Sequence, residues 1–327
     1  MTGLSDSFQR PINYLRISVT DRCNLRCVYC MPAAGITQMA HYDILSYEEI
    51  ITLVKAAAEL GINKVRLTGG EPLVRAGLSD LVRMLADIET IDDISLTTNG
   101  TLLAKYAADL KDAGLMRVNV SLDSLQPERF RQITRCGDLE DTLQGIEAAG
   151  AAGLNPVKIN MVVMAGVNDD ELPDFARKTI DDGWHVRFIE QMPVNGEEPA
   201  ASRLFSVSEM RKRIESLGAL EPWKVDVGNG PAKYFRLPGA KGTIGFITPV
   251  TEHFCYQCNR LRLTADGKLR LCLLNEDEID LKEPLRSGAS VAELKTIIQN
   301  AIAKKPKSHH LAPGNAHKGR PFSQVGG

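Results

Sequence analysis

Six apolar, β-rich runs recur between residues 15 and 189, and helical patterns separate them. The runs lie at 15–19, 64–68, 94–98, 117–122, 157–164 and 186–189. Strands that alternate with helices form a parallel sheet with helical crossovers. Six such units are two short of a closed (β/α)8 barrel. The sequence therefore predicts an α/β fold built on an open, partial (β/α)6 barrel.

The helical patterns have recognisable ends. A helix is predicted over 47–60, because Ser46 and Glu49 have the spacing of a capping box and Gly61 follows the last turn. Further helices are predicted at 79–88, 102–113, 139–152 and 171–182. These segments supply crossovers between the six runs.

Beyond Gln191 the periodicity changes. A loop over 193–202 precedes a short helix near 207–217, and short strands follow. The segment 261–272 predicts a β-hairpin, because Asp266-Gly267 is a preferred dipeptide of tight turns. We expect the barrel over 1–192, a smaller C-terminal region over 193–305 that closes it, and a mobile tail over 306–327 that ends in two glycines.

The composition disfavours several classes of protein. Lys and Arg number 39 against 41 Asp and Glu, a net charge of −2. A protein that coats nucleic acid or an anionic membrane would have a basic excess. No apolar run reaches the ~18 residues of a membrane span, and the first residues lack the apolar core of a signal peptide. We expect a cytoplasmic protein with no nucleic-acid or membrane partner.

The cysteines form two groups of three, plus Cys136 alone. The first triplet is Cys23, Cys27 and Cys30, and the second triplet is Cys255, Cys258 and Cys272. Thiols stay reduced in a cytoplasmic protein, so closely spaced cysteines indicate metal ligands before disulfides. Soft thiolates favour iron–sulfur clusters or zinc. Cys136 is interpreted as structural or incidental.

Three cysteines leave a metal cluster incomplete. A cubane [4Fe–4S] cluster ordinarily has four cysteine ligands, so three leave one iron open to bind another group. The second triplet also permits a Cys3His zinc site. Its histidine would be His253, His309, His310 or His317.

Polar motifs follow four of the predicted strands. They are the loop of the first triplet, Gly69-Gly70-Glu71-Pro72, Thr97-Thr98-Asn99-Gly100 and Ser121-Leu122-Asp123-Ser124. Parallel α/β sheets carry their chemistry in the loops after the strands' carboxyl ends. We therefore expect a site at this edge of the sheet. Asp123 would either orient a neighbouring group or cap the following turn.

These motifs carry a resemblance. Cys23-x3-Cys27-x2-Cys30, with Tyr29 before the last cysteine, resembles the radical S-adenosylmethionine (SAM) enzymes, and the Gly69–Pro72 motif resembles their second motif. VRLTGGEPLVR, LTTNG, VNVSLDS, VKINMVV, VRFIEQMPV and CxxCNRLRLTADGKLRLC follow in order. From Tyr14 to Cys272, and again in its final Gly-Gly, the chain resembles the GTP 3′,8-cyclase family of molybdenum cofactor biosynthesis.

The resemblance implies roles for individual residues. Each triplet would hold a [4Fe–4S] cluster with one open iron. The residues implied to contact SAM are Tyr29, Gly70, Ser121 and Met192. Those implied to contact GTP are Arg16, Arg66, Thr97, Lys158, Arg260, Leu261 and Arg262, with Lys64 a further candidate. Gly326 and Gly327 resemble a terminal pair that reaches into the active site.

The resemblance also implies a reaction. SAM would supply a 5′-deoxyadenosyl radical that removes the hydrogen at C3′ of GTP. Attack of C3′ on C8 would give (8S)-3′,8-cyclo-7,8-dihydroguanosine 5′-triphosphate, the first step of molybdopterin biosynthesis. The implied partners are a low-potential electron donor and, in the pathway, a cyclic pyranopterin monophosphate synthase. We expect a monomer or a homodimer, and assign no general base.

The cations suit a triphosphate. The chain has no Walker A motif, and Arg and Lys bind phosphate through forked donors or a point charge. The alternative is that each cation pairs with a local carboxylate. Arg260 and Arg262 would share one face of a strand. An ideal hairpin would set Cys272 opposite Leu261 on the other face, unless the strand is bulged or the pair lies beyond the regular ladder.

Two other functions fit parts of the pattern. A radical SAM peptide maturase with a second cluster would share the first triplet, but the cations would then lack an obvious role. A non-enzymatic iron–sulfur or zinc module that binds nucleic acid would need a basic face, which the net charge disfavours.

Overall fold

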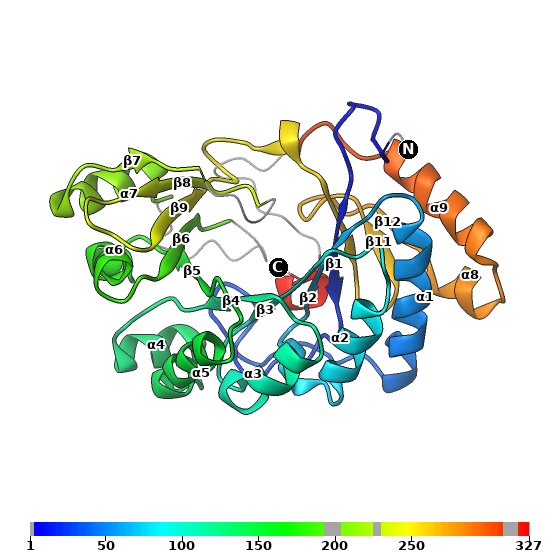
Figure 1. Ribbon diagram of the computed structural model, residues 1–327, viewed down its shortest axis with the longest axis horizontal. Coiled ribbons are helices and arrows are strands. Elements are labelled where there is room, and N and C mark those ends of the chain that lie inside the picture. Colours follow the sequence, from blue (N-terminus) through cyan, green and yellow to red (C-terminus); the bar gives the residue numbers. More distant parts are fainter. Residues whose placement is uncertain (1–2, 193–203, 225–229, 310–319, 327) are drawn as a thin grey trace.

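The protein folds around one curved sheet with helices on its outer side (Figure 1). The computed structural model describes residues 3–192, 204–224, 230–309 and 320–326. Twelve strands of the described residues follow the order β12-β11-β10-β1-β2-β3-β4-β5-β6-β9-β8-β7. The predicted 193–202 loop lies outside the described residues.

The six predicted strands are confirmed. They are β1 (Tyr14–Ser18), β2 (Lys64–Thr68), β3 (Asp93–Thr98), β4 (Arg117–Ser121), β5 (Lys158–Val163) and β6 (His185–Glu190). Neighbouring strands pair in parallel from β1 to β6. This arrangement is the partial barrel that the alternating pattern predicts.

The predicted helices between these strands are also confirmed. They are α1 (Tyr47–Ala58), α2 (Leu78–Ala86), α3 (Leu103–Asp112), α5 (Leu139–Ala151) and α6 (Leu172–Asp181). Ser46 and Glu49 form both hydrogen bonds of the expected capping box at α1. The short helix α4 (Pro127–Thr134) was not predicted. Short 3₁₀ helices lie at His41–Asp43, Pro72–Val74, Asp169–Glu171, Glu215–Leu217 and Cys255–Gln257.

The region after residue 203 extends the same sheet at both edges. Its elements are α7 (Val207–Ile214), β7 (Glu221–Pro222), β8 (Lys233–Arg236), β9 (Thr243–Ile247), β10 (Arg260–Leu263), β11 (Lys268–Arg270), β12 (Glu278–Asp280), α8 (Lys282–Arg286) and α9 (Val291–Ala303). β9 pairs in parallel with β6, and β10 pairs in parallel with β1. The parallel part of the sheet thus has two more strands than the six predicted. Among the described strands no ladder joins β7 to β12, so the barrel is open.

Strand alternation separates a core from a cavity. Ile17 and Leu67 are fully buried in the hydrophobic core, whereas Arg16 and Arg66 line the cavity inside the curved sheet. Successive strand residues point to opposite faces. Alternate residues of the same short strands therefore form an apolar outer face and a polar inner face.

The hairpin between β10 and β11 differs from the ideal two-residue turn. Arg262 lies opposite Arg270, and Leu263 lies opposite Leu269. The connection is therefore a three-residue loop, 265–267, in which Gly267 has a φ of 80° and donates its N–H to the Thr264 carbonyl (3.0 Å). The left-handed conformation favours glycine at this position.

This register settles the side on which Cys272 lies. Extending it sets Cys272 opposite Arg260, so the cysteine shares a face with Arg260 and Arg262. All three line the cavity. An ideal two-residue turn would instead have set Cys272 opposite Leu261. The extra loop residue shifts the register by one, and Cys272 lies beyond the regular ladder, since β11 ends at Arg270.

The end of the tail has a defined place in the structure. The short helix α10 (Phe322–Val325) lies inside the curve of the sheet (Figure 1), and Phe322 and Val325 are buried. The sequence predicted no packed element here. Residues 310–319 and 327 lie outside the described residues, so a mobile segment there stays a prediction. Within the described ranges, no helix combines the length and the apolar character needed to cross a bilayer.

Candidate functional site

A cavity of about 330 Å³ occupies the inside of the curved sheet. All six cysteines of the two triplets line it. No disulfide joins the seven cysteines, all of which lie within the described residues. The structure thus brings together two cysteine groups that are more than 220 residues apart in the sequence.

The loop after β1 presents the first triplet. Its backbone is fixed to the end of α4, because Arg26 N donates to the Thr134 carbonyl (3.0 Å) and Val28 N donates to the Ile133 carbonyl (2.9 Å). Within the loop, Leu25 N donates to Cys23 Sγ at 3.4 Å. The thiols are therefore held by backbone contacts of the folded chain.

The first triplet fits an iron–sulfur cluster. Burial raises the pKa of Cys23 to about 11 and that of Cys30 to about 12. Buried thiolates therefore need a positively charged partner. Three soft donors on one loop match the ligand preference of iron–sulfur clusters and leave one iron open.

The second motif lies directly against this loop. Gly70 N donates to the Thr20 carbonyl and Glu71 N donates to the Arg22 carbonyl, both at 2.7 Å. A Cβ atom at Gly70 would lie 2.2 Å from the Arg22 oxygen. Only glycine allows the two backbones to approach this closely.

Glu71 joins the loops that follow β2 and β3. Its buried carboxyl accepts hydrogen bonds from Thr98 Oγ1 (2.7 Å), Asn99 N (2.7 Å) and Leu73 N (3.1 Å). Burial raises the pKa of this carboxyl to about 7, and the three donors oppose the rise.

Replacing Gly70 with alanine is expected to weaken SAM binding by about tenfold or more. The added methyl group would separate the second motif from the loop of the first triplet. Anaerobic equilibrium dialysis of SAM would measure the loss. Gly150→Ala is the matched control, because nothing lies within 4 Å of a Cβ there. Equal SAM affinity of both variants would contradict the role given to Gly70.

The predicted SAM residues belong to the lining of this cavity. Tyr29, Gly70, Ser121 and Met192 all line it. Tyr29 Oη donates to Asp123 Oδ2 at 2.6 Å, and Val162 N donates to Asp123 Oδ1 at 2.8 Å. Of the two roles considered for Asp123, the structure favours orienting a neighbouring group.

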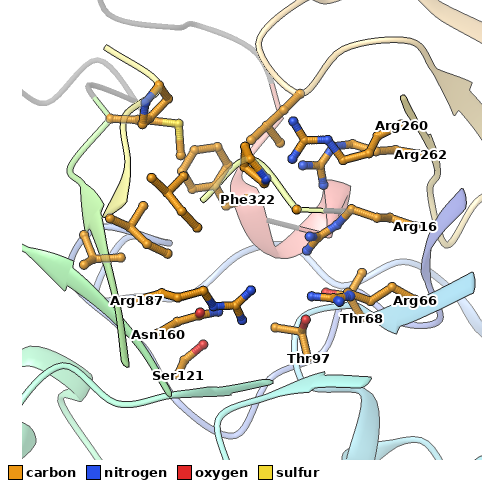
Figure 2. A pocket seen from close by; sticks show the side chains of 18 of the residues that line it. Arg16, Arg66, Thr68, Thr97, Ser121, Asn160, Arg187, Arg260, Arg262 and Phe322 are labelled. Carbon is orange, nitrogen blue, oxygen red and sulfur yellow. The ribbon is translucent and has the colours of Figure 1, made fainter. Parts of the chain in front are cut away.

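Cationic side chains from distant strands face the same cavity. Figure 2 shows Arg16, Arg66, Arg260 and Arg262 on one side and Arg187 on the other. Thr97, Lys64 and Lys158 also line the cavity. Leu261 is buried in the core and its side chain does not line the cavity. A contact of Leu261 with substrate would come from its backbone.

Burial and mutual repulsion make the charges of these cations unfavourable when no anion is bound. Burial lowers the pKa of Lys158 to about 7 and that of Arg187 to about 10, and Arg66 adds to both shifts by charge repulsion. Burial and nearby Arg260 lower the pKa of Arg262 to about 10. Arg187 Nε and Nη2 have no hydrogen-bond partner among the described residues. Such an arrangement suits a polyanionic ligand.

The second triplet has a more cationic setting than the first. Arg260 Nη2 donates to Cys258 Sγ at 3.8 Å. Burial raises the pKa of Cys258, but the charges of Arg260 and Lys305 outweigh it and bring the pKa to about 6. Burial raises the pKa of Cys255, so the cations favour the thiolate at Cys258. Three soft thiol ligands fit a second cluster with one open iron.

The histidines do not complete a Cys3His zinc site within the described residues. The ligand atoms of His253, Cys255 and His309 lie within 4.8 Å of one another, but this group includes neither Cys258 nor Cys272. The His253 and His309 rings stack with centroids 4.4 Å apart. His310 and His317 lie outside the described residues.

The C-terminal tail contacts the site at two points. The Ser323 backbone donates a hydrogen bond to Cys30, which lowers the pKa of that thiol against the larger effect of burial. Arg262 Nη1 donates to the carbonyls of Val325 (3.4 Å) and Gly326. Gly327 lies outside the described residues. The tail therefore contacts both the first triplet and the cations.

Arg187 and Asn160 line the cavity but were not predicted. Both occupy inward-facing positions of strands whose outward neighbours are apolar. The resemblance identified Arg16 and Arg66. A cation within an apolar strand is a further signal, and in His185–Glu190 it could have identified Arg187.

Known families and structures match nearly the whole chain. Residues 17–179 match the radical SAM superfamily, and residues 184–311 match Molybdenum Cofactor Synthesis C. SuiB of Streptococcus suis bound to precursor peptide SuiA superimposes with a TM-score of 0.64 at 13% identity, covering 91% of this chain and 71% of SuiB. That likeness concerns the fold alone.

Sequence relatives are closer. GTP 3′,8-cyclase of Moorella thermoacetica is 53% identical over 324 residues, covering 99% of this chain and 100% of the relative. GTP 3′,8-cyclase of Pelotomaculum thermopropionicum is 54% identical over 326 residues, with the same coverage. Together with the two cysteine triplets on one cationic cavity, this similarity shows that the chain belongs to the GTP 3′,8-cyclase family of radical SAM enzymes.

Proposed function

We propose that the protein converts GTP to (8S)-3′,8-cyclo-7,8-dihydroguanosine 5′-triphosphate, the first step of molybdopterin biosynthesis. The observation that carries this proposal is the shared cavity, where two cysteine triplets and eight cations lie together. The lining cations are Arg16, Lys64, Arg66, Arg117, Lys158, Arg187, Arg260 and Arg262, of which Arg117 pairs with Asp93. A peptide substrate would give this set of charges no evident role.

Each proposed cofactor has its own set of binding residues. Cys23, Cys27 and Cys30 would hold the SAM cluster, and Tyr29, Gly70, Ser121 and Met192 would contact SAM. Cys255, Cys258 and Cys272 would hold the second cluster. When bound, SAM and the reduced first cluster supply a 5′-deoxyadenosyl radical, chemistry that no side chain can perform.

The side chains act mainly by positioning GTP. The cations would bind the triphosphate, with Thr97 and the Arg260–Arg262 segment as further contacts. The hydrogen atom at C3′ of GTP would pass to the 5′-deoxyadenosyl radical, and C3′ would then form a bond to C8. Addition of one electron and one proton to the cyclised radical would complete the product. The product is thus an isomer of GTP. Holding C3′ in one orientation supplies much of the rate advantage.

GTP binding is expected to weaken as the pH rises above about 7.5. Lys158 has a pKa of about 7 in the free protein because of burial and neighbouring arginines. A bound triphosphate favours the charged amine and raises this pKa, so binding takes up a proton above pH 7. The dissociation constant should rise by about tenfold per pH unit, measured by anaerobic equilibrium dialysis between pH 7.5 and 9.

Lys158→Arg is the control for this pH dependence. Arginine keeps its charge throughout the range, so the slope should flatten. A slope that is the same in both proteins would assign the pH dependence to another group.

The proposed reaction is tested by 5′-deoxyadenosine formation with and without GTP. The reconstituted protein receives reductant and SAM under anaerobic conditions. Formation that depends on GTP, with matching loss of GTP, supports the cyclase. Formation that depends on an added peptide instead would support a maturase, and no formation with a verified first cluster would leave a metal-binding module.

The remaining partners belong to the same proposal. The reaction needs a low-potential electron donor, and its product suits a downstream cyclic pyranopterin monophosphate synthase. A cytoplasmic location and a monomeric or homodimeric state stay predictions.

A further inference from the structure

Two buried cations lie behind the second triplet, outside the cavity lining. Arg10 belongs to the N-terminal segment and is 4% exposed. Lys305 follows the end of α9 and is 3% exposed. Neither residue lines the cavity, so neither is placed to contact GTP. Their burial nevertheless needs a reason, because an isolated buried charge is costly.

Lys305 joins the two segments that carry Cys258 and Cys272. Its ammonium group donates to the Arg260 carbonyl at 2.9 Å and to the Leu271 carbonyl. Arg260 is two residues after Cys258, and Leu271 immediately precedes Cys272. A single side chain thus bridges the start of β10, just after Cys258, and the residue just before Cys272, which follows β11.

Arg10 fixes the third cysteine to the same part of the chain. Its Nη1 donates to the Cys255 carbonyl (2.7 Å) and the Lys307 carbonyl (3.0 Å), and its Nη2 donates to the Pro306 carbonyl (2.7 Å). Asp6 pairs with Arg10 Nε at 2.6 Å. The charge of Arg10 is therefore largely balanced within its own segment.

The charge of Lys305 is balanced differently. Among the described residues no carboxylate lies within ion-pair distance of Lys305. Burial lowers the pKa of its amine, and the negative charges of Cys258 and Cys272 oppose that shift. Within the described residues, Cys258 and Cys272 are thus the groups whose negative charge most favours this ammonium.

We propose that Lys305 is a positioning residue for the second cluster: it sets the spacing of Cys258 and Cys272, and its buried charge raises the cluster's reduction potential. This inference rests on the proposed function, which assigns a [4Fe–4S] cluster to the second triplet. Reduction adds one negative charge to a cluster that already carries three thiolates. A cation held nearby in a medium of low polarity stabilises the reduced form more than the oxidised form.

Redox titration of the reconstituted full chain, followed by electron paramagnetic resonance, tests the proposal. The second-cluster signal is the one that disappears in Cys255→Ala. In Lys305→Met, the ratio of reduced to oxidised second cluster at a fixed potential should fall about tenfold, equivalent to about 59 mV for one electron. The first-cluster potential should stay unchanged.

Two variants serve as controls. Lys304→Met removes the same charge from the exposed neighbour and should shift neither potential. Lys305→Arg keeps a charge and should retain the wild-type ratio more closely than Lys305→Met. Should Lys305→Met fail to load the second cluster, its iron content would fall by half while Lys305→Arg remained loaded, which supports the positioning role.

Several results would overturn the role proposed for Lys305. Full iron content with an unchanged second-cluster potential in Lys305→Met would overturn the proposal. So would equal shifts or equal cluster loss in both Lys305 variants, or the same effect in Lys304→Met. These readouts need no GTP, so a shifted potential in a protein that fails to convert GTP would count against the proposed function alone.

Discussion

Replacing Cys27 with alanine is expected to reduce 5′-deoxyadenosine formation to the level of a protein-free control and to halve the iron content. The first triplet offers three ligands on one loop, and two cannot hold a cluster in the required geometry. Product analysis by chromatography and iron determination on the same anaerobic sample measure both effects.

Two other cysteines sharpen this prediction. Cys136 is exposed and outside both triplets, so Cys136→Ala should retain iron and activity. Cys255→Ala should also halve the iron content, yet retain some cleavage of SAM without conversion of GTP. Full 5′-deoxyadenosine formation by Cys27→Ala would contradict the assignment of the first cluster.

Replacing Arg187 with methionine is expected to weaken GTP binding by about 30-fold or more. The arginine is 5% exposed, and two of its nitrogen atoms have no partner among the described residues. Loss of one partner of a buried charge pair costs about 2–5 kcal/mol. Equilibrium dialysis with GTP measures the effect.

The same substitution should not destabilise the GTP-free protein. Burial and repulsion from Arg66 already disfavour the charge of Arg187, so an apolar side chain of similar length removes an unfavourable term. Urea denaturation should give an equal or higher free energy of unfolding. Arg177→Met, at an exposed position of α6, is the control. Unchanged GTP affinity in Arg187→Met would remove Arg187 from the binding site.

Local sequence patterns predicted much of the fold. The Ser46–Glu49 capping box and the bounds of β2 depend on neighbouring residues, so a short window of sequence contains the information. The two cysteine triplets are similarly local. Their spacing pointed to metal ligands before any contact was known.

Features that depend on distant partners were not predictable in this way. The parallel pairing of β9 with β6 and of β10 with β1 joins segments far apart in the chain. The hairpin register depended on one loop residue, because a three-residue loop and a two-residue turn both accommodate Asp266-Gly267. The inward direction of Arg187 likewise required the sheet to be complete.

For the site, too, residues within local motifs were predictable and residues defined by distant contacts were not. Residues within motifs, such as Tyr29 and Gly70, do line the cavity. The side chain of Leu261 does not, because it alternates with Arg260 and Arg262 on the strand. Lys305 has no motif of its own, and its contacts with two distant carbonyls appear only in three dimensions.

The most direct test uses GTP that carries deuterium at C3′. The reconstituted protein is incubated anaerobically with reductant, SAM and the labelled GTP, and 5′-deoxyadenosine is analysed by mass spectrometry. We expect transfer of one deuterium atom from C3′ into 5′-deoxyadenosine, together with loss of GTP. 5′-Deoxyadenosine without deuterium, formed while GTP is consumed, would contradict hydrogen abstraction at C3′.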